Sequence, residues 1–223
     1  MNFFGHAALA ASHFEAQRPS PDEAELWRLC AGAMLPDFWG MLRLRRPAVR
    51  DDSVARGVQF HHATDAEFHE LASFHRLSRD AFAWLSEHGL PRGPARAVAH
   101  IGIEMLLDEV FAREASARDA YRGALALPLA ELLDFPAPED GPRLTALQQA
   151  LLGRTAWLQQ PPAELVAERI TRTLSGRPRL ATDAAGQLLL GHWVTRSRPQ
   201  VEAEAPEVLA ALRTRLASFG RGE

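Results

Sequence analysis

Two segments of the chain place histidine and carboxylate side chains at intervals of four residues. They are His61, Asp65 and His69 in GVQFHHATDAEFH, and His100, Glu104 and Asp108 in AHIGIEMLLDEVF. Side chains four residues apart lie on the same face of an α-helix, so each segment presents a row of ionisable groups. The neighbouring residues are largely apolar, and burying a lone charge is costly. The groups of each row are therefore expected to pair with one another, with an arginine or with a metal ion.

Imidazole and carboxylate groups are ligands that Mn, Fe and Zn ions accept. Two more ionisable residues lie in apolar surroundings, His6 in MNFFGHAALAAS and Asp37 in AGAMLPDFWG. One interpretation is a metal centre built from four separate elements. The alternatives are a core or capping role for His6, a surface hydrogen-bonded pair of His61 with Asp65, and bonding of the α-helical carboxylates to arginines. His69 is expected to be exposed or partly exposed.

Helical periodicity and helix-capping residues extend over most of the chain, and alternating strand patterns are missing. The expected helices are 22–35, 52–72, 78–89, 94–120, 143–158, 161–175, 180–195 and 199–218. The proline-rich segment PLAELLDFPAPEDGP, residues 128–142, is expected to form a surface loop. The sequence therefore predicts one all-α domain over residues 1–223, with no sheet of more than two short strands.

Composition limits the function classes. The net charge of −3 does not suit a general polyanion binder, so no nucleic-acid partner is expected. The single cysteine, Cys30, cannot form an internal disulfide, and its apolar helical setting predicts a buried structural thiol. No apolar segment reaches the roughly 18–20 residues that span a bilayer. The apolar start of the chain lacks a basic region before it, so no signal peptide is expected. A cytoplasmic location is therefore expected.

Four motifs occur in order along the chain: MNFFGHAALA at the start, GAMLPDF, then VARGVQFHHATD, and the helix EMLLDEVFA. Together they resemble the bacterial acyl carrier protein phosphodiesterase family. The later GRPRL, residues 176–180, resembles a segment near the family's C-terminal region. The order matches over nearly the whole chain, with residues 120–170 divergent. The resemblance implies an all-α helical bundle of the HD-like phosphohydrolase type, in which His and Asp ligands hold one or two divalent metals.

Carried over residue by residue, the resemblance implies a set of metal ligands. They are His6, Asp37, His61, Asp65, Glu104 and Asp108. It implies a divalent cofactor, Mn²⁺ first, with Fe, Mg or Zn as alternatives. The chain departs from the family at three positions, with His62 for an arginine, His69 for an aspartate and Glu109 for a histidine. These departures allow another substrate, another metal preference or lost activity.

The implied reaction is phosphodiester hydrolysis that releases 4′-phosphopantetheine from acyl carrier protein. A divalent ion would lower the pKa of a bound water and offset phosphoryl charge. Asp65 would orient or deprotonate the water, a role that Asp108 could also take, and His62 or His100 would protonate the leaving alkoxide. Acyl carrier proteins are acidic, so the basic stretch RLRRPAVR, residues 43–50, suits a docking surface, with an ordinary solvated loop as the alternative. Its arginines Arg43, Arg45 and Arg46 are the expected substrate-binding residues.

Two other function classes stay open. One is a non-catalytic helical protein of the same fold that binds a partner, and the other is a phosphohydrolase acting on a nucleotide or another small phosphoester. A di-iron carboxylate oxidase is disfavoured because its Glu-x-x-His signature does not occur twice. Metal content and turnover on generic diesters would separate these classes.

Overall fold

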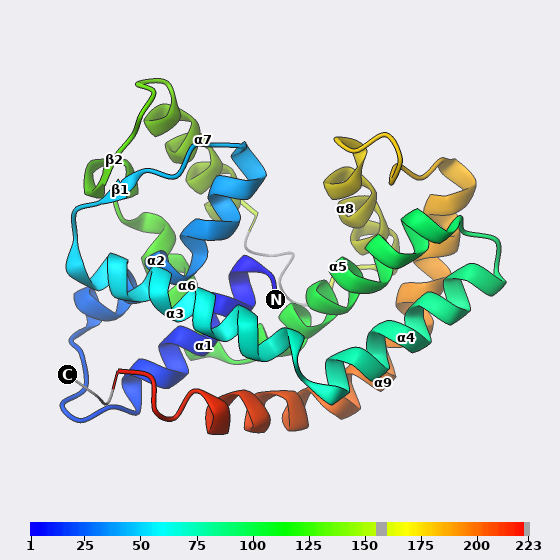
Figure 1. Ribbon diagram of the computed structural model, residues 1–223, viewed down its shortest axis with the longest axis horizontal. Coiled ribbons are helices and arrows are strands. Elements are labelled where there is room, and N and C mark those ends of the chain that lie inside the picture. Colours follow the sequence, from blue (N-terminus) through cyan, green and yellow to red (C-terminus); the bar gives the residue numbers. More distant parts are fainter. Residues whose placement is uncertain (155–159, 221–223) are drawn as a thin grey trace. The chain divides into compact units, whose positions relative to one another are not determined.

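The computed structural model of the chain describes residues 1–154 and 160–220. Within them the protein is all-α, with strand limited to two residues in each of two short segments (Figure 1). The elements are α1 (Phe3–Glu15), α2 (Glu23–Leu42), β1 (Ala48–Val49), α3 (Asp52–His69), α4 (Ala72–Glu87), α5 (Arg92–Phe111), α6 (Ala115–Ala126), the 3₁₀ turn η1 (Leu129–Leu132), β2 (Leu133–Asp134), α7 (Asp140–Leu152), α8 (Ala163–Ser175) and α9 (Ala184–Arg215). β1 pairs antiparallel with β2, Ala48 opposite Asp134. The all-α prediction and the limit on sheet are confirmed for the described residues.

The chain divides into two compact units. Unit 1 comprises Met1, residues 67–110 and, of the described chain, 160–215; unit 2 comprises residues 2–66, 111–154 and 216–220. Each unit has its own buried apolar residues. The single domain over residues 1–223 stays a prediction.

Unit 2 is built around α1, which packs against α2 and α6. Its core is rich in aromatic rings, with Phe4 edge-on to Tyr121 at 5.1 Å between centroids. α2 and α3 meet at Gly32 and Gly57, where a Cβ on either glycine would overlap a main-chain carbonyl oxygen of the opposite helix. Only glycine allows this backbone-to-backbone approach. The close approach sets the spacing between the helices that carry Asp37 and His61.

Unit 1 is organised by the long helix α9, which packs against α4 and α8. Trp193 of α9 is fully buried, and its indole ring lies against Gly102 of α5 so closely that a Cβ there would overlap the ring. Arg198 of α9 forms a two-pronged ion pair with Glu109 of α5, with Nε 2.9 Å from Oε2. α5, which carries one of the two polar rows, is thereby attached to α9 by packing and by charge.

Several predicted helix ends move in the structure. α2 continues to Leu42 through Pro36, and α9 continues through Pro199, so a proline that should end a helix does not. In α9 the buried residues Val194, Ser197, Val201 and Ala205 lie on one face, and their packing outweighs the hydrogen bond lost at proline. α4 begins at Ala72, ahead of the predicted start at residue 78. It ends at Glu87, and Gly89, with φ of 94°, follows the helix at the predicted stop.

The predicted helix 94–120 is two helices, α5 and α6, separated at residues 112–114. Arg118 donates hydrogen bonds to the carbonyl oxygens of Ala112, at 2.6 Å, and Arg113, at 2.8 Å. These hydrogen bonds satisfy carbonyl groups in the turn between α5 and α6. Helical periodicity in the sequence does not reveal this turn. The predicted loop 128–142 contains η1, β2 and the start of α7. The predicted helix 143–158 extends into residues 155–159, which lie outside the described residues.

Among the described helices, none is both long enough and apolar enough to cross a membrane. Cys30 is fully buried, its Sγ lies 3.6 Å from the Ala7 carbonyl oxygen, and burial raises the pKa of its thiol. The predicted structural thiol is confirmed as a buried one.

Candidate metal centre

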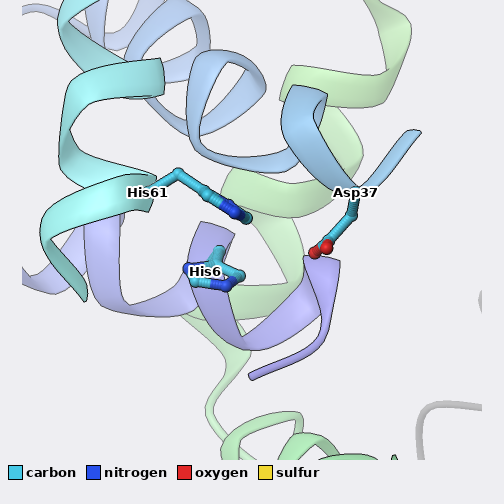
Figure 2. Close-up of side chains that lie close together, drawn as sticks. All are labelled: His6, Asp37 and His61. Atoms are coloured by element: carbon cyan, nitrogen blue, oxygen red, sulfur yellow. The ribbon is translucent and has the colours of Figure 1, made fainter. Parts of the chain in front are cut away.

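His6, Asp37 and His61 come together in unit 2 from α1, α2 and α3 (Figure 2). One ligand atom from each residue lies within 4.8 Å of the other two. Both imidazoles are buried and the carboxylate is half-buried. Three donors bonded at about 2.1 Å to one ion in tetrahedral geometry lie about 3.4 Å from one another. The three ligand atoms would therefore have to approach one another by up to about 1.4 Å to share an ion.

His61 is held in the form that binds a metal. Its Nδ1 lies 2.8 Å from the carbonyl oxygen of Ala33, and because a carbonyl only accepts, Nδ1 carries the proton. Nε2 is then left with its lone pair available as a ligand. Burial lowers the pKa of His61 to about 4, against the opposing effects of the Ala33 hydrogen bond and of Asp65. The ring is consequently neutral at pH 7.

Asp65 lies at the edge of the same group. Its Oδ1 is 3.9 Å from Nε2 of His6, and its side chain is 40% exposed. The rings of His6 and His61 are themselves in contact, with centroids 3.9 Å apart. Unit 2 thus brings together four of the predicted ligands, with three converging and the fourth, Asp65, open to solvent beside His6.

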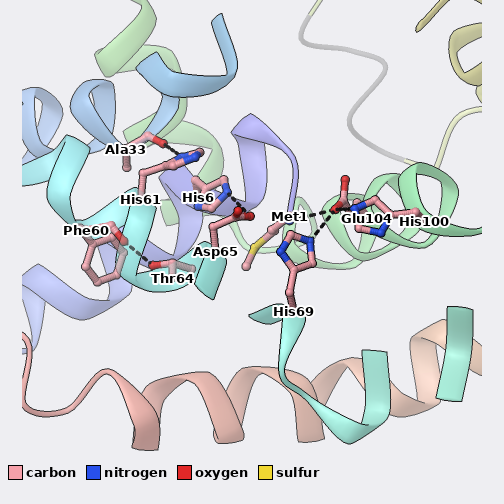
Figure 3. A network of polar contacts seen from close by, with 10 residues as sticks. All are labelled: Met1, His6, Ala33, Phe60, His61, Thr64, Asp65, His69, His100 and Glu104. Atoms are coloured by element: carbon pink, nitrogen blue, oxygen red, sulfur yellow. Dashed lines mark hydrogen bonds and ion pairs between the residues drawn. The ribbon is translucent and has the colours of Figure 1, made fainter. Parts of the chain in front are cut away.

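The other two predicted ligands belong to unit 1. Glu104 of α5 is 8% exposed, and its Oε1 lies 3.1 Å from Nε2 of His100 and 3.5 Å from Nε2 of His69 (Figure 3). The α-amino group of Met1 lies 3.1 Å from the same oxygen. Asp108 is buried one turn further along α5. The sharing of one centre by these two carboxylates and the residues of unit 2 stays a prediction.

Electrostatics around Glu104 favour its charged form. Burial acts to raise the pKa of this carboxyl, but the Met1 ammonium, His100 and His69 together outweigh it, so the pKa of Glu104 lies well below its usual range. The carboxylate is therefore ionised at neutral pH although it is buried.

No family model, curated protein or solved structure matches this chain.

The predicted catalytic and substrate-binding residues are accessible. His62 is exposed next to His61, with ring centroids 5.4 Å apart. Arg43, Arg45 and Arg46 are exposed in the segment after α2. Arg46 places its guanidinium 5.8 Å from the ring centroid of Trp39, within cation–π range. His100, the other candidate acid, is in unit 1 and contacts Glu104.

Sequence reasoning missed the partners of His69. Its expected partial exposure agrees with a side chain that is 33% exposed, yet the ring reaches Glu104 and stacks on His100 at 5.0 Å between centroids. The four-residue spacing showed that His69 belongs to a polar row. It gave no signal of which residue on another helix lies opposite.

Glu109 has a structural explanation. The resembling motif has a histidine at this position, whereas the Glu109 carboxylate is 6% exposed and paired with Arg198. A buried ion pair that loses one partner is strongly destabilised. Glu109 therefore attaches α5 to α9.

Proposed function

We propose that the chain is a metal-dependent phosphodiester hydrolase of the HD-like type, with His6, Asp37 and His61 as metal ligands. One observation carries the proposal: two buried imidazoles and a carboxylate from three helices converge, with the Nδ1 proton of His61 directed to Ala33. A second group hydrogen-bonded to the far ring nitrogen is the usual way in which proteins orient a ligating histidine.

The donor set fits a divalent transition metal. Two imidazoles and one carboxylate suit Mn, Fe or Zn, and the motif resemblance favours Mn²⁺ over Fe, Zn or Mg. When bound, the ion would act as a Lewis acid that favours deprotonation of water and offsets charge on the phosphoryl oxygens. A neutral His61 supports binding because no proton has to be removed before a metal enters.

Asp65 and His62 are the side chains we assign to proton transfer. Asp65 is half-exposed beside His6, so its carboxylate can accept a proton from a water that enters from solvent. His62 is exposed on the neighbouring position of α3 and can donate a proton to the leaving alkoxide. Asp108 and His100, the alternative candidates, belong to unit 1.

The proposed substrate is the phosphopantetheine diester of acyl carrier protein. Exposed arginines in the segment after α2 support this choice because such carriers are acidic and a basic patch promotes their docking. Planar guanidinium groups also bind phosphate oxygens two at a time. A small phosphoester is the alternative substrate, and it would make the arginine segment dispensable.

The test measures release of 4′-phosphopantetheine from holo-acyl carrier protein, and cleavage of a generic aryl diester, with Mn²⁺ present. We expect both activities in the wild type and neither in His61→Ala or Asp37→Asn. His192→Ala is the matched control, because His192 is an exposed histidine of α9, and it should retain both. Full turnover in His61→Ala would overturn the proposal.

A variant with Arg43, Arg45 and Arg46 all changed to Ala tests the substrate. We expect it to lose turnover of the carrier protein and to keep cleavage of the aryl diester. Equal activity of this variant and the wild type on both substrates would exclude docking through this segment.

A non-catalytic binding role is the second candidate. It is favoured by the Glu109–Arg198 ion pair, which uses a family histidine position for structure. It predicts no turnover of either substrate by the metal-loaded wild type.

A further inference from the structure

A second convergence of metal-ligating side chains lies in unit 1. His69, His100 and Glu104 each offer a ligand atom within 4.8 Å of the other two. His100 and Glu104 are four residues apart on α5, so they project from the same face of one helix. His69 is the last residue of α3. A pair of ligands on one helix and a third from a neighbouring segment is a common way to build a chelating site.

Aromatic packing positions the two imidazoles. Their rings stack with an interplanar angle of 22°, and Phe74 contacts both, with centroids 5.4 Å from His69 and 5.3 Å from His100. Aromatic packing of this kind restricts the rotamers of the two histidines. Metal binding therefore loses less side-chain conformational entropy, because the fold already orders the two histidines.

The cluster combines a buried charge with open access. The Glu104 side chain is 11% exposed, while those of His69 and His100 are 33% and 47% exposed. A cation can therefore reach the carboxylate from solvent past the two rings. Three protein ligands with solvent at the fourth position is the pattern of an open zinc site, and two His with one Glu is an established ligand set for it.

We propose that His69, His100 and Glu104 bind Zn²⁺ at a site whose ligands all belong to unit 1. No ligand of this site is shared with the His6, Asp37 and His61 cluster, so the inference holds whether or not that cluster is catalytic. Neither histidine matches a ligand position of the motifs that resemble acyl carrier protein phosphodiesterases.

A cationic group already occupies part of this site. The α-amino group of Met1 lies 3.1 Å from Oε1 of Glu104 and neutralises its charge. A divalent ion carries twice that charge and gains two imidazole ligands, so binding displaces the ammonium from the carboxylate. Zinc binding is expected to be weakened by this competition without being prevented.

The test is a titration of the metal-free, full-length protein with Co²⁺, followed by displacement with Zn²⁺. Co²⁺ reports coordination by histidine through its visible absorption, and Zn²⁺ abolishes that signal when it takes the same site. We expect His100→Ala and Glu104→Gln each to bind one equivalent less of Co²⁺ than the wild type. His75→Ala, an exposed histidine of α4, should bind as much as the wild type.

The His61→Ala variant separates this proposal from the proposed function. Loss of an equivalent in His100→Ala but not in His61→Ala supports the zinc site and counts against the unit 2 centre. Wild-type stoichiometry in both His100→Ala and Glu104→Gln overturns the zinc site whatever His61→Ala does. His100 is nearly half exposed, so its variant should fold, and circular dichroism checks that it does.

Discussion

The two histidine–carboxylate clusters use the same residue types in opposite environments. In unit 2 the imidazoles of His6 and His61 are buried and the carboxylate of Asp37 is half-buried. In unit 1 the carboxylate of Glu104 is buried and the two imidazoles are open to solvent. Burial therefore acts on the base in one cluster and on the acid in the other.

The contrast shows how environment selects a protonation state. In unit 2 burial lowers the pKa of His61 to about 4 and leaves a neutral ligand. In unit 1 burial acts to raise the pKa of Glu104, and the neighbouring ammonium and imidazoles reverse that effect, which leaves a charged ligand. Each cluster thus presents the ligand form that a metal requires, by a different route. The unit 2 cluster should depend more strongly on helix packing than the unit 1 cluster, whose two imidazoles are partly open to solvent.

Gly57→Ala should cause the largest loss of stability. An added Cβ would overlap the Leu29 carbonyl oxygen and lie 2.9 Å from the Cα of Gly32, so α2 and α3 must separate. We expect unit 2 to lose about 3 kcal/mol or more of stability. Hydrogen exchange measured by mass spectrometry should show lost protection in α2 and in residues 52–66, with α4 and α9 unchanged.

Gly40→Ala is the matched control for that change. Gly40 also lies in α2, but no atom lies within 4 Å of the position that a Cβ would take. We expect unchanged hydrogen-exchange protection, or a gain of up to about 1 kcal/mol in the stability of unit 2, because alanine is the better helix former. Equal effects of the two substitutions would contradict the close approach at Gly57.

The next largest expected effect is the pH dependence of stability in the metal-free protein. The pKa of His61 is about 4 when folded and about 6.5 when unfolded, so the unfolded state binds the additional proton between these values. The free energy of unfolding should therefore rise by about 3 kcal/mol from pH 4 to pH 6.5 through this group, and this contribution is lost as the pH falls through the same window.

Urea denaturation of the wild type and His61→Gln across that range measures the contribution. Glutamine does not titrate and can still donate to the Ala33 carbonyl, so the variant should show a flatter pH dependence. Parallel curves for the two proteins would mean that His61 is not held neutral by burial.

Asp65→Ala should change stability little and activity greatly. The side chain is 40% exposed and 3.9 Å from His6, so solvent already screens its charge. We expect a change of less than about 1 kcal/mol and a fall in turnover of about 10²–10⁴-fold, the usual contribution of a general base. A purely structural partner of a buried base would instead cost about 3–5 kcal/mol on removal. Thermal melting and aryl diester cleavage on one sample decide between the two.

His100→Ala should have the smallest effect on stability. Its ion pair with Glu104 spans 3.1 Å, but the ring is nearly half exposed, and such pairs contribute less than about 1 kcal/mol. We expect a nearly unchanged urea midpoint beside the lost equivalent of Co²⁺. A large loss of stability would show that the unit 1 cluster also stabilises the fold.

The sequence by itself determined the local features of this protein. Helical periodicity predicted the all-α class, and the i, i+4 spacing predicted that His100 and Glu104 share a helix face. The apolar setting of Cys30 predicted a buried thiol. These features depend on interactions within about four residues, which any short segment displays. The same spacing also predicted a polar row that contains Asp65 and His69.

Tertiary structure decided which helices meet, and so which rows of side chains face one another. His69 lies against His100 and Glu104, and Asp37 lies against His6 and His61, because of packing between segments far apart in the chain. The glycine contact between α2 and α3 and the continuation of α9 through Pro199 have the same origin. Packing free energy summed over many buried contacts outweighs local propensity, and a single sequence does not show which distant residues supply those contacts.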